Sequence, residues 1–204
     1  MRNREIATTA LIILVAVVLT GLLATASVGA NQEASANAAG GPSKAVAAAR
    51  VERGGYLVWA MGCNDCHTPW KKADAGAEPD MSRELSGHPE SMVMPPPPPL
   101  PPGPWIALIG ATNTTFAGPW GVSFTANLTP DNETGLGKWT EKMFLDTLRS
   151  GRHQGVGRQI LPPMPWKMIG SANDEDLKSI FAYLQSLKPI KNKVPQPVDP
   201  PQAH

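Results

Sequence analysis

The chain has 204 residues, a length that fits one globular domain with appendages. Its 18 basic and 17 acidic residues leave a formal net charge of +1 at pH 7, so no basic surplus indicates a nucleic-acid partner. Only two cysteines are present, whereas proline (22 residues) and glycine (19 residues) are abundant. This composition excludes a disulfide-rich scaffold and predicts long irregular connections around a small helical core.

Residues 1–30 predict a membrane anchor or a signal peptide. Arg2 and Arg4 precede an uncharged apolar run at residues 6–28, which as a helix would reach about 34 Å and cross a bilayer core. Residues 28–30, Val-Gly-Ala, would also suit cleavage of a signal peptide. The length of the run favours a retained anchor in a bacterial inner membrane over a cleaved signal and a soluble periplasmic protein. Both interpretations place the rest of the chain on the periplasmic side.

Residues 31–44 are mostly Ala, Asn, Gly and Ser and predict a flexible linker. The domain that follows is expected to span residues 45–190. Its first helix is predicted at residues 44–61 and contains Gly54 and Gly55, which weaken a helix. The pair is explained by close approach of another helix, and a hinge at the glycines is the alternative.

The sequence CNDCH at residues 63–67 carries the most specific chemistry of the chain. Cys-x-x-Cys-His is the attachment pattern of a c-type haem: the two thiols add across porphyrin vinyl groups, and the imidazole coordinates the iron. The i, i+3 and i, i+4 spacings place all three side chains on one face of a helical turn. We therefore predict one covalently attached haem c. Its predicted attachment points are Cys63 and Cys66, and its first axial ligand is His67.

Three other uses of the two cysteines compete with haem attachment. A redox dithiol would need a βαβ context, and none precedes the motif. A disulfide would be strained across three residues and would leave His67 unexplained. A zinc site would need histidines as further ligands, and their spacing is not that of a zinc finger. The histidines of the chain are His67, His88, His153 and His204.

The segment after the motif predicts irregular structure. Residues 79–105 form a proline-rich insertion, and eight prolines fall within residues 95–104. Such a run favours an extended polyproline II strap on the domain surface. Two short segments rich in Gly and Thr follow, at residues 106–118 and 120–127. A short hairpin is the regular structure that they could form. Residues 128–138 predict turns.

Two further helices are predicted towards the C-terminal end. The first covers residues 139–148, with Thr140 as its N-cap. The second covers residues 173–187, is capped by Asn173, and carries an apolar stripe that we expect to pack on the glycine pair of the first helix. Residues 191–204 predict a proline-rich tail. The helices together predict an all-α fold with long Pro/Gly-rich loops and an N-terminal transmembrane helix or signal segment.

A second axial ligand is expected among the methionines and the remaining histidines. Met164 is favoured because it lies in Leu-Pro-Pro-Met-Pro-Trp, residues 161–166, where prolines hold a loop between the two later helices. Met168 is the next candidate. His88 or His153 would give bis-histidine ligation and a lower reduction potential. Core filling is the alternative role for a methionine in an apolar loop.

Three features in this order resemble class I-like monohaem cytochromes c: CNDCH after a Gly/aromatic helix, a Pro-Met-Pro loop, and Phe-Ala-Tyr-Leu at residues 181–184. The runs at residues 126–131, 134–140 and 163–166 are similar to the cytochrome c modules of bacterial membrane-bound electron-transfer complexes, including alcohol and sugar dehydrogenases. Those dehydrogenase subunits carry several haems, whereas this chain has a single motif. The resemblance implies a small all-α fold around one haem c. The haem-binding residues that it implies are Cys63, Cys66, His67 and Met164.

A haem with protein ligands on both faces has no open position for a substrate, so we expect an electron carrier and not an enzyme. Redox proteins are the expected partners, with no nucleic acid and no small-molecule substrate. The alternative is a fixed cytochrome subunit of a larger respiratory, photosynthetic or dehydrogenase membrane complex. Residues 147–173 contain basic residues and no acidic ones, which would steer an acidic partner or bind the haem propionates. These basic residues are Arg149, Arg152, Arg158 and Lys167.

Overall fold

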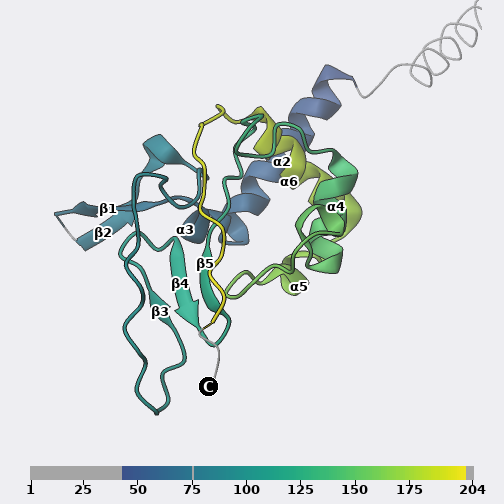
Figure 1. Ribbon diagram of the computed structural model, residues 1–204. Helices are drawn as coiled ribbons and strands as arrows, with labels where there is room; N and C mark the ends of the chain where they lie inside the picture. Colours follow the sequence, from purple (N-terminus) through teal and green to yellow (C-terminus); the bar gives the residue numbers. More distant parts are fainter. Residues whose placement is uncertain (1–42, 75, 201–204) are drawn as a thin grey trace, which may run out of the picture. The chain divides into compact units, whose positions relative to one another are not determined.

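The computed structural model describes residues 43–74 and 76–200 (Figure 1). One compact unit of the chain begins at Ala48. The α-helices of the described chain are α2 (Lys44–Ala60), α3 (Cys63–His67), α4 (Glu141–Ser150), α5 (Trp166–Ile169) and α6 (Asp174–Ser186). The strands are β1 (Trp70–Ala73), β2 (Gly76–Pro79), β3 (Leu108–Ile109), β4 (Thr115–Gly118) and β5 (Gly121–Phe124). Short 3₁₀ turns occur at Met81–Arg83 and His153–Gly155.

The helices predicted from the sequence are present and begin where their caps predict. Thr140 begins α4 by accepting a hydrogen bond from the N–H of Met143 at 3.2 Å. Asn173 begins α6 by accepting from the N–H of Asp176 at 2.8 Å. Side chains from α2, α4, α5 and α6 then share one apolar core. Its buried members are Leu57, Val58, Leu85, Leu136, Phe144, Leu148, Ile169, Leu177, Ile180, Phe181 and Leu184.

The glycine pair of α2 marks the crossing with α6. A Cβ on Gly54 would overlap the backbone carbonyl of Ser179, and a Cβ on Gly55 would lie 3.0 Å from the ring of Tyr183. Only glycine therefore allows this close approach at residue 54. The prediction that the final helix packs on the glycine pair is confirmed. The hinge alternative is wrong, because α2 runs unbroken through both residues.

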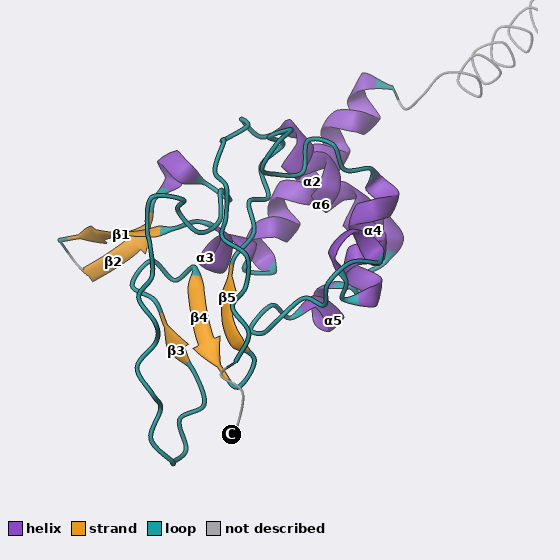
Figure 2. Ribbon diagram, in the orientation of Figure 1, coloured by secondary structure: helices purple, strands orange, loops and turns teal. Residues whose placement is uncertain are grey.

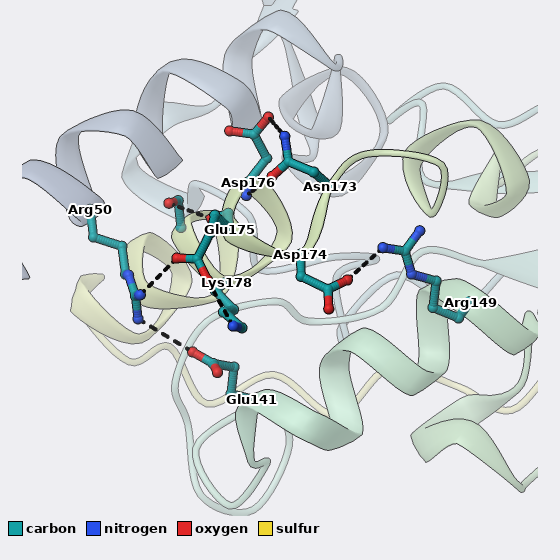
Figure 3. Close-up of polar contacts among 9 residues, drawn as sticks. Arg50, Glu141, Arg149, Asn173, Asp174, Glu175, Asp176 and Lys178 are labelled. Atoms are coloured by element: carbon teal, nitrogen blue, oxygen red, sulfur yellow. Dashed lines mark hydrogen bonds and ion pairs between the residues drawn. The ribbon is translucent and has the colours of Figure 1, made fainter.

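Ion pairs tie the first turn of α6 to its neighbours (Figure 3). Arg50 of α2 lies 3.0 Å from Glu175 and 3.6 Å from Glu141. Arg53 lies 2.9 Å from Asp176. Exposed pairs of this kind stabilise a fold by only about 0–1 kcal/mol each, so the apolar core contributes more to this packing than they do.

The expectation of an all-α fold is wrong, because two antiparallel sheets lie between α3 and α4 in the chain (Figure 2). One sheet pairs β1 with β2, and the other has the order β3-β4-β5. The short hairpin considered in the sequence is present as β4 and β5, joined by Pro119 and Trp120. Gly121 starts β5 with φ +90°, which side chains rarely allow. Strands of two to four residues are too short to give a readable period of two.

The C-terminal segment up to residue 200 lies along the domain. The side chain of Asn192 is buried and donates to the carbonyls of Ser86 at 2.7 Å and His88 at 2.8 Å. Further along, Val198 pairs in both directions with Val122 on β5, at 2.8 and 2.9 Å. These two bonds attach the C-terminal segment to β5 at one residue pair. The proline-rich residues 95–104 form a loop with neither helix nor strand.

In the part of the chain that the structure describes, no helix is both long and apolar enough to cross a membrane. The expected N-terminal transmembrane helix therefore has no support in these residues. The apolar run at residues 6–28, on which that prediction depends, lies outside them.

Candidate haem-attachment site

Helix α3 consists of the CNDCH motif alone. Gly62 precedes it in the left-handed conformation, with φ 70° and ψ 24°, which turns the chain sharply out of α2. Because α3 spans Cys63–His67, both thiols and the imidazole stem from a single helical turn. This is the arrangement that the spacing predicts.

Hydrogen bonds hold α3 against the segment that follows. Thr68 Oγ1 donates to Asn64 Oδ1 at 2.7 Å and accepts from the N–H of Leu85 at 2.9 Å. The carbonyl of Asp65 accepts from Trp70 Nε1 at 3.0 Å. Asn64 and Thr68 are almost completely buried, so the bonds that they make are shielded from water. The motif is therefore fixed in place by side chains that sequence patterns do not reveal.

The imidazole of His67 is buried and has one nitrogen committed. Its Nδ1 lies 2.8 Å from the carbonyl oxygen of Ala126. A carbonyl can only accept, so Nδ1 carries the proton and Nε2 carries the lone pair. Burial lowers the pKa of His67 and keeps the ring neutral. No hydrogen bond within the described residues engages Nε2. Histidines that ligate metals have this arrangement, with one nitrogen bonded to a carbonyl and the other free.

Gly87 makes room for the carbonyl that holds His67. Its φ is +75°, and a Cβ there would lie 2.6 Å from Ala126 O and 2.5 Å from Thr125 O. The N–H of Gly87 also donates to the carbonyl of His67 at 2.7 Å. Neither Gly87 nor Ala126 is predicted from the sequence. A glycine in a turn is a weak signal, and a backbone acceptor leaves none.

Cys63 and Cys66 are free, half-buried thiols, so the disulfide alternative is not supported. Burial raises the pKa of Cys63 to about 11 and raises the pKa of Cys66 as well. The attacking thiol of a redox dithiol has a lowered pKa, which is the opposite direction. Two reduced thiols one turn apart are the reactants that addition to two vinyl groups requires. With an unengaged His67 Nε2 beside them, these residues fit a covalently attached haem.

The zinc alternative lacks ligands. The described residues contain no group of three or more His, Cys, Asp or Glu side chains that could hold a metal ion. His88 is buried, with Nε2 2.9 Å from Met92 O and Nδ1 within 2.9 Å of the hydroxyls of Thr114 and Thr115. Both nitrogens of His88 are therefore committed, which also argues against His88 as a second axial ligand.

Met164 is half-buried and packs against the apolar core, as Cys63 does. Met168, the other methionine considered, is 59% exposed. His153 lies at the surface, where its ring packs edge-on against Trp139 at a centroid distance of 5.1 Å. These placements favour Met164 among the predicted candidates, and its ligation stays a prediction. His204 lies outside the described residues.

The loop that carries Met164 is anchored on both sides. Before it, the carbonyl of Pro162 accepts a hydrogen bond from Ser123 Oγ at 2.6 Å. After it, the indole of Trp166 packs over Gly151, where a Cβ would overlap the ring. Gly151 has φ +67° and also terminates α4. The sequence predicts the loop but not the role of Ser123, because the contact joins segments far apart in the chain.

No protein-family model matches the chain. A nicotinate dehydrogenase component of Pseudomonas putida is 35% identical over 77 residues, which are 38% of this chain and 6% of that protein. The fructose dehydrogenase cytochrome subunit of Gluconobacter japonicus is 33% identical over 82 residues, 40% of this chain and 17% of that protein. The cytochrome c subunit of the quinone alcohol dehydrogenase of Gluconobacter oxydans is 32% identical over 80 residues, 38% and 16% of the two chains.

The matched region thus spans no more than 17% of the length of these three relatives. Two of them are named as cytochrome subunits of dehydrogenases. The predicted resemblance to cytochrome c subunits of bacterial dehydrogenase complexes is confirmed by these similarities.

Proposed function

We propose that this chain transfers electrons through one covalently attached haem c, as a cytochrome subunit of a larger bacterial dehydrogenase complex. The observation that carries the proposal is His67: it ends a Cys-x-x-Cys-His turn, with Nδ1 committed to a carbonyl and Nε2 unengaged. The similarity to dehydrogenase cytochrome subunits supports a subunit over a free carrier. We infer a periplasmic location for the domain, because both interpretations of the N-terminal segment export it.

Each residue of the site has a separate task. Cys63 and Cys66 would hold the haem through thioethers. His67 and Met164 would supply its two axial ligands. When bound, the haem takes up and releases one electron as its iron alternates between ferric and ferrous states. The carbonyl of Ala126 fixes the ring of His67 and makes Nε2 a stronger donor. As a ligand, the neutral sulfur of Met164 would favour the reduced state and raise the potential.

With His67 and Met164 both bound to its iron, the haem would have no coordination position left for a substrate. We therefore assign no catalytic residue and no small-molecule substrate to the chain. Two of the relatives are likewise named as cytochrome subunits, not as the subunits that act on the substrate.

Part of the predicted basic surface would steer an acidic redox partner. Arg149 does not belong to it, because its guanidinium pairs with Asp174 at 2.7 Å (Figure 3). The same guanidinium donates to the carbonyl of Ala172 at 2.9 Å. The other three basic residues of this segment are exposed and form no ion pair within the described residues. They flank the loop of Met164 in sequence, where positive charge would speed association at low ionic strength. These residues are Arg152, Arg158 and Lys167.

The test is purification of the full chain from its native cell envelope in mild detergent. We expect a ferrous haem spectrum that carbon monoxide does not change, together with a dehydrogenase subunit in stoichiometric amount. A spectrum that shifts with carbon monoxide would contradict the two protein ligands. A coloured protein that always purifies alone would contradict the subunit role and leave a free carrier.

A further inference from the structure

One short stretch of main chain, residues 123–126, contacts two parts of the candidate haem site. At its start, Ser123 is 7% exposed and its Oγ donates to the carbonyl of Pro162 at 2.6 Å. At its end, the carbonyl of Ala126 accepts from Nδ1 of His67 at 2.8 Å. The same segment therefore meets the loop of Met164 and the ring of His67.

This stretch is fixed along its length. The N–H of Thr125 donates to the carbonyl of Thr114 at 3.0 Å, and the carbonyl of Thr125 accepts from the N–H of His88 at 3.0 Å. Just before it, Val122 is paired in both directions with Val198. Because the segment is hydrogen-bonded on both sides, its two ends do not move independently. Residues 123–126 can therefore keep the loop of Met164 and the ring of His67 in a fixed relation to one another.

The loop of Met164 has few hydrogen-bond donors of its own. Pro162, Pro163 and Pro165 have no N–H, so a donor from another segment carries more weight here than in an ordinary turn. Within the described residues, the hydrogen bond to the carbonyl of Pro162 comes from Ser123 alone. That hydroxyl is buried, so water does not replace it readily.

We propose that Ser123 is a positioning residue for Met164. Its hydroxyl ties the methionine loop to residues 123–126, which also orient His67, and so would keep the sulfur of Met164 in place to bind a haem iron. The inference rests on the proposed function, because it concerns the second axial ligand of a haem.

The test replaces Ser123 in the full-length ferric protein and measures how fast cyanide displaces the sixth ligand. Ser123→Ala should accelerate cyanide binding about tenfold and weaken the methionine–iron charge-transfer band. Ser123→Thr keeps the hydroxyl and should restore both properties towards wild type. The matched control is Ser179→Ala on α6, which removes an equally buried hydroxyl that donates to the carbonyl of Glu175 at 2.7 Å. This control should leave the cyanide rate at the wild-type value.

A wild-type cyanide rate in Ser123→Ala would overturn the proposal. Equal acceleration in Ser179→Ala would also overturn it, because general loss of stability would then be the cause. Failure of the proposed function gives a different result: the wild-type protein would lack a covalently bound haem or would lack the charge-transfer band. In that case no variant comparison arises, and the positioning role falls with the function on which it rests.

Discussion

Replacing Gly87 by alanine tests how the site holds His67. Alanine at φ +75° costs about 1–2 kcal/mol in backbone strain. Its Cβ would also meet Thr125 O at 2.5 Å and Ala126 O at 2.6 Å, both backbone atoms, which must move for an ordinary contact. Overpacking of this kind costs about 1–3 kcal/mol. We therefore expect Gly87→Ala to lower the free energy of unfolding by about 2–5 kcal/mol.

The displaced atom is the acceptor for His67 Nδ1, so the effect should reach the haem. A weaker bond at Nδ1 makes Nε2 a poorer donor to ferric iron, and the reduction potential should rise. Thermal unfolding and a spectroelectrochemical titration of the full chain measure both effects. The control is Gly76→Ala, which also has a positive φ, +128°, but nothing within 4 Å of the new Cβ. If the two variants are equally stable and have the same potential, the reasoning about the Ala126 carbonyl is wrong.

Three further predictions follow from the packing and the burial. Met164→Ala should abolish the weak charge-transfer band at the red end of the ferric spectrum. The control Met168→Ala, at a 59% exposed position, should leave the band unchanged. A band that survives in Met164→Ala rejects Met164 as the ligand. In denaturant titrations, Gly54→Ala should lose about 3 kcal/mol of stability, whereas Gly55→Ala should stay within about 1 kcal/mol of wild type. Equal losses would contradict the close approach of α2 and α6 at Gly54. Burial lowers the pKa of His88. Below about pH 6.5 the imidazole therefore binds a proton in the unfolded chain but not in the folded chain, and protonation favours unfolding. Calorimetry should show that the melting temperature falls as the pH drops through this range. His88→Gln should make the melting temperature depend less on pH. An unchanged pH dependence in this variant would contradict the lowered pKa of His88.

The helical half of the domain follows from local sequence signals. Thr140 and Asn173 are side-chain caps that act within three residues of their own position, so sequence alone locates α4 and α6. The glycine pair of α2 likewise indicates a close helix crossing before any partner is known. The haem motif depends on spacing within a single turn, which is also local information.

The sheets and the supports of the site depend on contacts between distant segments. Ser123 and Pro162 are far apart in the chain, and so are His67 and Ala126, so no local pattern pairs them. Arg149 also has a partner that its own segment does not reveal. Its own segment lacks acidic residues and so predicts a basic rim, but its partner Asp174 lies in the first turn of α6.

Covalent attachment of one haem at α3 is the claim on which the whole account rests. Peptide mass spectrometry of the mature protein tests it most directly, after treatment with a thiol-alkylating reagent and digestion. We expect the peptide that contains residues 63–67 to carry the mass of one haem, with neither Cys63 nor Cys66 alkylated. A peptide without the haem mass and with both cysteines alkylated would contradict the account.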